Sequence, residues 1–152
     1  MRSDLDRLMK EREIDWAIVV GSPRDSADMY YLSNGARVGH SYLLKEQGRS
    51  PILVYTPMER DEAKKSGLQT ISTVDLLGAS GVRSINAYEY NLNLITEAFR
   101  RFGVHGRVAF YGHWDLNPGL AVILSLRRRV RGVEIVEEQG RSIFAEARIT
   151  KE

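Results

Sequence analysis

The sequence predicts a single α/β domain with a mixed, mostly parallel β-sheet and helices on both of its faces. Three observations support this fold class. Short apolar runs at residues 14–21 and 107–112 are rich in branched side chains, which is typical of strands buried on both faces. Segments with helical apolar spacing alternate with these runs. Two further apolar runs are separated only by a short turn at residues 46–51, so we expect one antiparallel hairpin.

The N-terminal part of the chain predicts a helix, the central strand and a second helix. Ser3 has an acidic residue three positions later, the spacing of an N-cap followed by a helix. The central strand is the run at residues 14–21. Ser22 and Pro23 then predict the start of the second helix, because proline is favoured at the first helical position, and the dipeptide at residues 34–35, Asn-Gly, ends it.

The next part predicts the hairpin and one well-defined helix. Residues 41–45 and 52–55 are the two hairpin strands. Residues 56–59, Thr-Pro-Met-Glu, supply a cap, a proline and a capping-box glutamate, and Gly67 ends the helix that they begin.

The remaining half continues the alternation of strands and helices. Residues 68–74 predict a strand, whereas glycines and serines interrupt any pattern at residues 76–86. The later predicted elements are a long helix from about residue 88 closed by Gly103, a strand at 107–112, a helix at 117–126, a half-buried strand at 133–137 and a short helix at 141–149.

Composition limits the class of protein. A chain of 152 residues with 43% apolar content can bury one core. No stretch approaches the roughly 20 apolar residues of a membrane span, and the charged N-terminus lacks a signal-peptide apolar region. We therefore expect a soluble, cytoplasmic protein without a membrane partner. The absence of cysteine excludes disulfides, thiolate metal sites and thiol catalysis.

Charge gives no support for a nucleic-acid partner. The net charge is only +2. A basic cluster at residues 127–131 follows an apolar helical run, so it is interpreted as cations that complement the C-terminal end of a helix dipole. The alternative is an anion- or nucleic-acid-binding patch, but interleaved aromatic residues, zinc-finger spacing and RNA-binding motifs are absent from the sequence.

Residues that carry chemistry are few and scattered. His40, His105 and His113 lack metal-ligand spacing, and a role of His113 with Asp115 in holding a turn is favoured over a ligand or catalytic role. Residues 21–24 follow a strand in a position where phosphate can bind, but a Walker lysine and a G-x-G-x-x-G motif are missing, and a capped helix explains the same residues. We predict no catalytic residue and no metal ligand in this chain.

Four stretches together resemble one protein family. Residues 5–19 resemble the pattern LxxLMxxxxID followed by small and branched residues, and residues 30–35, YYLSNG, resemble YYLSG with one inserted asparagine. Residues 55–63 resemble a strand, proline and acidic helix, and residues 148–152 resemble an R-x-x-K segment. In this order and spacing they are similar to the N-terminal domain of the creatinase/prolidase/Xaa-Pro aminopeptidase family, the "pita-bread" metallopeptidases.

The resemblance implies a ribonuclease-H-like topology and two regions. Residues 1–147 are the expected creatinase/prolidase N-terminal-like domain, and residues 148–152 the start of a linker to a catalytic domain absent from this chain. In the family, two Asp, one His and two Glu of that domain hold a dinuclear metal centre, for which Mn, Co or Zn is expected. Those ligand motifs are absent from residues 1–152, so no cofactor is expected in this chain.

The resemblance also implies a function. The chain is expected to be the non-catalytic N-terminal domain of an Xaa-Pro dipeptidase- or aminopeptidase-like metallopeptidase, contributing to dimerisation and substrate access. Its expected partners are its own C-terminal catalytic domain, a second copy in a homodimer and proline-containing peptides. The candidate substrate-proximal residues are Arg37, which suits a substrate carboxylate, and His40, which suits a peptide carbonyl.

Three alternatives remain open at this stage. The loop at residues 37–42 has the composition of an ordinary exposed hairpin loop. The chain is alternatively a stand-alone peptide- or protein-binding module without hydrolytic activity, which uses the same loop. A weaker hypothesis is a binder of small anions or nucleotides at residues 21–24.

Overall fold

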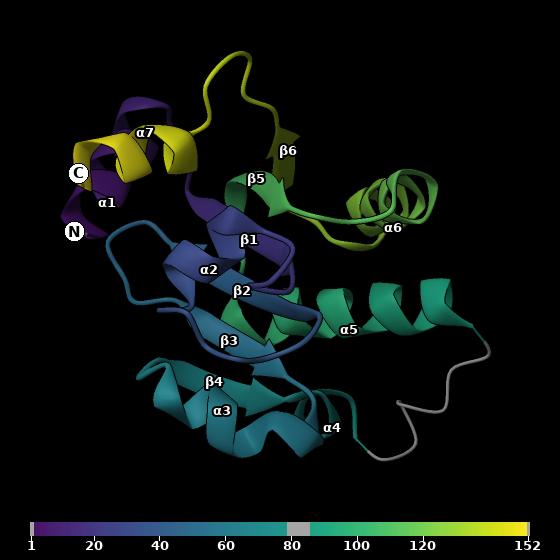
Figure 1. Cartoon of the computed structure of the whole chain (residues 1–152). Helices are drawn as coiled ribbons and strands as arrows, with labels where there is room; N and C mark the ends of the chain where they lie inside the picture. The colour runs from purple at the N-terminus through teal and green to yellow at the C-terminus, as the bar shows by residue number, and fades with distance from the viewer. Residues whose placement is uncertain (1, 79–85, 152) are drawn as a thin grey trace.

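The central strand β1 (Trp16–Gly21) is buried along its whole length, as its unbroken apolar run predicts. In the computed structural model, which describes residues 2–78 and 86–151, it belongs to a six-stranded sheet with the order β4-β3-β2-β1-β5-β6 (Figure 1). It pairs antiparallel with β2 (Ser41–Glu46) and parallel with β5 (Gly106–Gly112).

The outer strands complete a mixed, mostly parallel sheet. Strand β3 (Ile52–Tyr55) is antiparallel to β2, β4 (Gln69–Ser72) is parallel to β3, and β6 (Val133–Val136) is parallel to β5. The predicted hairpin is therefore β2–β3. Strand β2 runs opposite to both of its neighbours, which matches the predicted ribonuclease-H-like arrangement.

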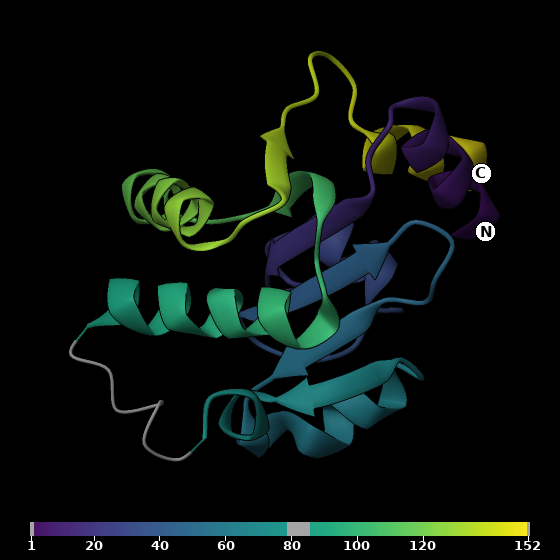
Figure 2. The same cartoon turned by 180° about the vertical axis from the view of Figure 1, so that it is seen from behind.

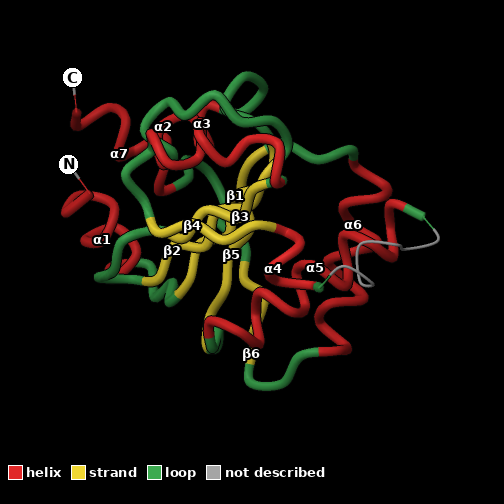
Figure 3. The backbone as a smooth tube through the Cα atoms, turned by 90° about the horizontal axis from the view of Figure 1, so that it is seen from below, coloured by secondary structure: helices red, strands yellow, loops and turns green. Residues whose placement is uncertain are grey.

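Helices cover both faces of the sheet, as predicted (Figure 3). One layer consists of α1 (Arg2–Glu11), α2 (Ala27–Leu32), α3 (Arg60–Lys65), which follows the 3-10 helix η1 (Pro57–Glu59), and α7 (Ile143–Lys151). The other consists of α4 (Thr73–Leu77), α5 (Ala87–Phe102) and α6 (Leu116–Arg129). Over residues 2–78 and 86–151, no helix combines the length and the apolar character that crossing a membrane requires.

Two hydrophobic cores result from the alternation of side chains along the strands. In β1, Ala17 and Val19 face the layer of α1, α2 and α7, whereas Trp16, Ile18 and Val20 face the layer of α5 and α6. Successive side chains of a strand point to opposite faces, so an unbroken apolar run supplies both cores at once.

The start of α2 differs from the prediction. Ser26, not Ser22, caps this helix, and its Oγ accepts a hydrogen bond of 3.1 Å from the Met29 amide. Pro23 lies in a turn in which the Ser22 Oγ accepts from the Asp25 amide at 3.2 Å. The Ser-Pro pair therefore begins a turn. The prediction was wrong because turns and helix N-termini favour the same residues.

Other boundaries are partly as predicted. Gly67 and Gly103 follow their helices with φ of +74° and +66°, the left-handed conformation expected of a helix stop. Helix α1 begins at Arg2, so Ser3 lies inside it rather than at its cap. The predicted strand at residues 68–74 ends at Ser72, which caps α4. The unassigned stretch at residues 76–86 begins within α4, and residues 79–85 lie outside the described residues.

Candidate functional site

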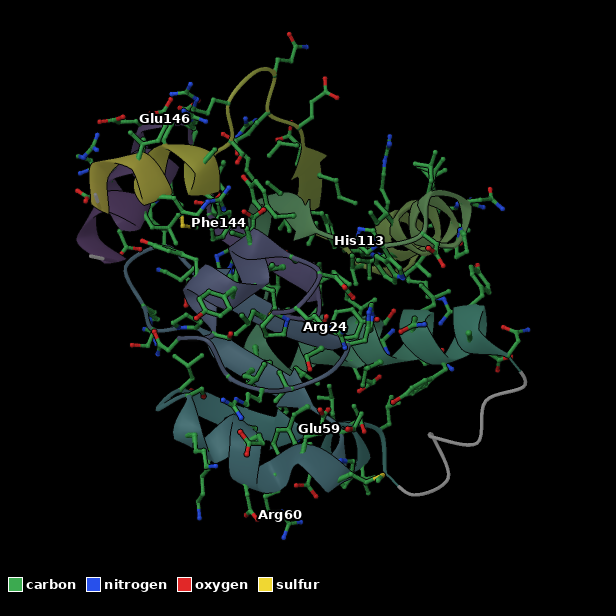
Figure 4. The ribbon with its side chains drawn as sticks, in the orientation of Figure 1. Arg24, Glu59, Arg60, His113, Phe144 and Glu146 are labelled. Carbon is green, nitrogen blue, oxygen red and sulfur yellow. The ribbon has the colours of Figure 1, made fainter. Side chains whose placement is uncertain are left out.

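Four loops converge at one edge of the sheet. Strands β1, β3 and β5 run in the same direction and β2 runs against them, so the carboxyl ends of the first three lie beside the amino end of β2. The loops at this end are residues 22–26, 36–40, 56–59 and 113–115, and we call them the loop edge. Figure 4 shows Arg24, Glu59 and His113 along it.

At the loop edge, the chain leaves the neighbouring strands β1 and β5 toward opposite faces of the sheet. After β1 the chain continues to α2 in one helical layer, and after β5 it continues to α6 in the other. Ligands of open α/β sheets bind at such points, outside the carboxyl ends of the strands. A cavity of about 270 Å³ lies there, and its lining includes Val20, Gly112, His113 and Trp114.

An aromatic cluster of His40, Tyr42 and Trp114 borders this point. The ring centroids of His40 and Tyr42 are 5.7 Å apart, and those of His40 and Trp114 are 6.3 Å apart. The rings of Tyr42 and Trp114 are 6.0 Å apart at 73°, an edge-to-face arrangement that aromatic pairs favour. The buried Tyr42 donates its hydroxyl hydrogen to the Asn91 side chain of α5, which fixes the ring on which His40 packs.

Burial changes the proton affinity of two members of the aromatic cluster. The pKa of His40 is below its ordinary value of 6.5, chiefly because partial burial disfavours the charged imidazolium. Asp115 opposes this shift and His113 adds to it. Burial also raises the pKa of the Tyr42 hydroxyl, and the nearby Tyr90 adds a smaller effect. Both shifts favour the neutral form of the side chain.

The loop that carries His40 is held from two sides. The Gly39 amide donates to Glu59 Oε2 at 2.5 Å, and the other oxygen of this carboxylate accepts from the Thr56 hydroxyl at 2.9 Å. Ala36 and Val38 are buried in the core under α2. The loop is thus anchored by both packing and a carboxylate, which limits its conformations.

The candidate substrate-proximal residues lie on the surface of this loop. Arg37 stands between two buried neighbours, so its side chain is exposed, and it forms no ion pair with any of the described residues. His40 is also exposed on one side while its ring packs on the aromatic cluster. His105 is exposed between α5 and β5, at the other end of β5 from His113, so the three histidines do not converge.

A reactive centre is absent from the described part of the chain. No group of three or more His, Asp or Glu side chains there is placed to hold a metal ion, so these residues do not fit the family's dinuclear centre. Neither His40 nor His113 forms a side-chain hydrogen bond with a hydroxyl or a carboxylate of the described residues, so no activated nucleophile is formed.

A second, larger cavity of about 870 Å³ lies beside α2. Its lining includes Arg24, Tyr30, Asn34 and Arg148. Arg148 of α7 forms an ion pair with Asp28 of α2, and it lines this cavity together with Tyr30 and Asn34 of the YYLSNG motif. Residues 21–24 do not open a helix, which removes the geometry on which phosphate binding at this position depended.

Comparison with solved structures identifies the fold of this chain. No protein-family model and no curated protein sequence matches the chain. The prolidase from Pyrococcus horikoshii has a TM-score of 0.55 at 16% identity, over 97% of this chain and 34% of that one. The prolidase from Pyrococcus furiosus has a TM-score of 0.52 at 16% identity, over 87% and 31%. The fold is that of a creatinase/prolidase N-terminal-like domain.

The chain spans about a third of the length of these two prolidases, 34% and 31%. A creatinase/prolidase N-terminal domain of an Xaa-Pro dipeptidase from Streptococcus pyogenes aligns with a TM-score of 0.47 at 14% identity, over 88% of this chain and 99% of that domain.

Within this prolidase N-terminal-like fold, sequence analysis missed two residues of the loop edge. Glu59 was predicted to cap a helix, but its carboxylate holds the Gly39 amide, 20 positions away. Trp114 was not among the predicted site residues, yet it packs on His40. Its position two residues after the end of strand β5 is the one available signal, because the carboxyl ends of strands in α/β sheets carry sites.

Proposed function

We propose that this chain is the non-catalytic N-terminal domain of an Xaa-Pro dipeptidase- or aminopeptidase-like metallopeptidase of the cytoplasm. Residues 1–147 form the domain, and residues 148–152 begin the link to a catalytic domain. In this proposal the domain contributes to dimerisation and to substrate access. The fold that it shares with the two prolidases supports this assignment.

The observation that carries the proposal is the anchored loop with His40 on the aromatic cluster and Arg37 on its surface. A neutral imidazole can donate a hydrogen bond to a peptide carbonyl, and the guanidinium fork of Arg37 suits the terminal carboxylate of a dipeptide. The partly exposed ring of Trp114 offers apolar contact for a proline ring. Together these groups match the parts of a proline-containing dipeptide.

The proposal places metal chemistry outside residues 1–152. The dinuclear Mn, Co or Zn centre expected from the family needs clustered carboxylates and imidazole, which the described residues do not supply. The purified chain should therefore fail to hydrolyse Ala-Pro or Gly-Pro in the presence of added Mn²⁺, Co²⁺ or Zn²⁺. Turnover that copurifies with the chain would contradict the assignment.

The DNA after codon 152 gives the most direct test of parentage. The proposal expects an open frame of roughly 200 further residues, the size of an additional domain, with two Asp, one His and two Glu in ligand motifs. A stop codon directly after residue 152 would contradict it. In the longer protein, Arg37→Ala should raise KM for proline dipeptides with less effect on kcat, because the contact is made in the ground state as well.

The alternative function is a stand-alone peptide- or protein-binding module. One observation favours it: the contacts that hold the 36–40 loop, from Glu59 and the core under α2, all lie within this chain. A stop codon after residue 152 together with dipeptide binding by the isolated chain would select this alternative. Loss of that binding in Arg37→Ala, and its retention in Arg60→Ala, a matched exposed arginine, would locate it.

A further inference from the structure

Helix α6 carries an apolar stripe that no part of the described chain covers. Leu116, Leu120 and Leu124 recur every fourth residue, and 85%, 51% and 42% of their surfaces are exposed. Residues at this spacing lie on one side of a helix. Figures 1 and 2 show α6 at the outer end of its layer, beyond α5. Exposed apolar surface of this kind marks a site of interaction.

The stripe has a recess at one end and positive charge at the other. The 270 Å³ cavity is lined by Trp114 together with Leu116, Leu120 and Ile123, so it lies beside the start of the stripe. At the other end, Arg127, Arg128 and Arg129 form the last turn of α6, and Arg131 follows.

The basic end lacks acidic partners within the chain. Arg129 donates to the Asn93 side chain at 2.9 Å, and among the described residues no carboxylate forms an ion pair with Arg127, Arg128 or Arg131. The helix dipole accounts for some of this charge, but its effect on a cation at an exposed site is small and falls off within one turn. It does not account for three exposed leucines in line with the arginines.

We infer that this face of α6 binds an acidic amphipathic helix of another protein. Such a helix lays its apolar side chains along the leucine stripe, places one of them in the recess beside Trp114, and directs its acidic end to residues 127–131. In recognition by an amphipathic helix, apolar anchors supply affinity and charge sets orientation.

A second copy of the chain fits this surface less well. A two-fold axis would pair α6 antiparallel with itself and bring the start of one helix to the basic end of the other. The start of α6 offers one carboxylate, Asp115, next to His113 and the positive end of the helix dipole. The charges therefore favour a partner that is more acidic than this chain.

A lipid surface fits less well too. Helices that lie on membranes carry cations along the length of their polar face. Beside the leucines of α6 stand Asn117, Ala121 and Ser125, which are uncharged, and the arginines are confined to one end.

Trp114 gives a direct readout of binding. It stands at the recess and is partly exposed, whereas Trp16 is only 3% exposed and supplies a constant background. The probe is a synthetic helix of about 20 residues with leucines at every fourth position and glutamates at its N-terminal end. Its control carries lysines in place of the glutamates. We expect a saturable change in fluorescence with the acidic probe, and at least about tenfold weaker binding of the basic one.

Variants of the chain make the test specific. Leu120→Asp should abolish binding of the acidic probe, whereas Met58→Asp, at a side chain that is 98% exposed on another element, should leave it unchanged. Replacing Arg127, Arg128 and Arg131 with glutamate should reverse the preference toward the basic probe. Arg60→Ala, at an exposed arginine of α3 in the other helical layer, should leave the binding of both probes unchanged.

Four results would overturn the inference. Equal affinity for both probes would show non-specific apolar contact, and no saturation up to about 1 mM would show no recognition. Sedimentation that reveals a dimer which Leu120→Asp dissociates would assign the surface to a second copy. Binding to phosphatidylserine vesicles that is lost in Leu120→Asp would assign it to a membrane.

Discussion

Gly112 shows how one residue decides whether the loop edge forms. Its φ is +105°, and a Cβ at this position would lie 1.9 Å from the Val20 carbonyl oxygen. The neighbouring atom is backbone of the central strand, so it cannot move without breaking the β1–β5 ladder. Only glycine permits the chain to turn from β5 toward His113 and Trp114.

Gly112→Ala should therefore lower the free energy of unfolding by about 3 kcal/mol, from the backbone clash and the positive φ together. Urea denaturation followed by far-ultraviolet circular dichroism measures this loss. The matched control is Gly48→Ala in the hairpin turn, where φ is +80° and nothing lies within 4 Å of the added Cβ. It should cost only about 1 kcal/mol.

His40 predicts a dependence of stability on pH. Because partial burial lowers its pKa below 6.5, the unfolded chain binds a proton at this site more readily than the folded chain does. The contribution of His40 to stability is thus full above pH 6.5 and declines as the pH falls through 6.5 toward the folded pKa.

His40→Gln removes the titrating group. Between pH 7.5 and pH 5, the free energy of unfolding of the wild type should therefore fall by more than that of the variant. Urea titrations at both pH values measure that double difference. A difference that is constant with pH would show that the imidazole of His40 is not desolvated in the folded chain.

For single residues, the sequence predicted which side chains lie on the surface of the loop better than it predicted which residues touch one another. Arg37 and His40 were identified from the loop after the YYLSNG motif, and both are exposed on it. Glu59 and Trp114 were not assigned to the site, because their contacts with Gly39 and His40 join separate elements. Local spacing contains no information on such pairs until the strand order is known.

Among the elements, η1 has the unexpected role of holding the 36–40 loop. Glu59→Ala removes the acceptor of the Gly39 amide and of the Thr56 hydroxyl, which should cost about 2 kcal/mol. Hydrogen exchange of the amides at residues 36–40 should accelerate. In the control Glu62→Ala, only an exposed pair with Lys65 is lost, so the change should stay below about 0.5 kcal/mol.

Helix α1 is fixed to the sheet by a charged contact. Lys45 of β2 is fully buried, and its Nζ lies 2.5 Å from Asp6 Oδ1, which also accepts from the Gly48 amide at 2.9 Å. Asp6→Ala leaves the buried ammonium without this countercharge and should cost about 3 kcal/mol by thermal or urea denaturation.

The control for Asp6 is on the same helix. Glu11→Ala removes only the exposed pair with Arg7 and should cost less than about 0.5 kcal/mol. Equal losses in the two variants would show that Lys45 keeps its charge compensated without Asp6.

The elements were predicted best where periodicity and a stop signal agree. Helix α5 and strand β1 are such cases, and both occur where expected. The start of α2 was wrong because Ser22 and Ser26 are both competent caps, and the choice between them depends on where α2 packs. The antiparallel pairing of β1 with β2 was not derivable from the hairpin signal, because α2 separates these strands in sequence.

In the whole molecule, the last helix, α7, packs into the same hydrophobic core as the first helix, α1. Phe144 of α7 is fully buried, and its ring lies 4.9 Å from that of Tyr111 and 6.3 Å from that of Tyr31. Phe144→Ala should therefore cost about 4 kcal/mol. In the same helix, Ile149→Ala, at a side chain that is 52% exposed, should cost less than about 1 kcal/mol in the same urea titration.

The fold class of the whole molecule followed from the sequence because both cores depend on patterns that are local. The buried runs and amphipathic helices needed no knowledge of long-range pairing to predict a sheet covered on two sides. The shared role of α1 and α7 was not predictable in this way, since 131 positions separate the end of one from the start of the other.

Because α1 and α7 pack against each other, the two ends of the chain emerge at the same corner of the molecule (Figure 1). A short Gly-Ser linker could join the two ends, and new ends could be opened in the turn between β2 and β3. The resulting circularly permuted chain would keep every helix and strand of the core in place. For the same reason, an affinity tag on the first residue occupies the space that any segment following the last residue must enter.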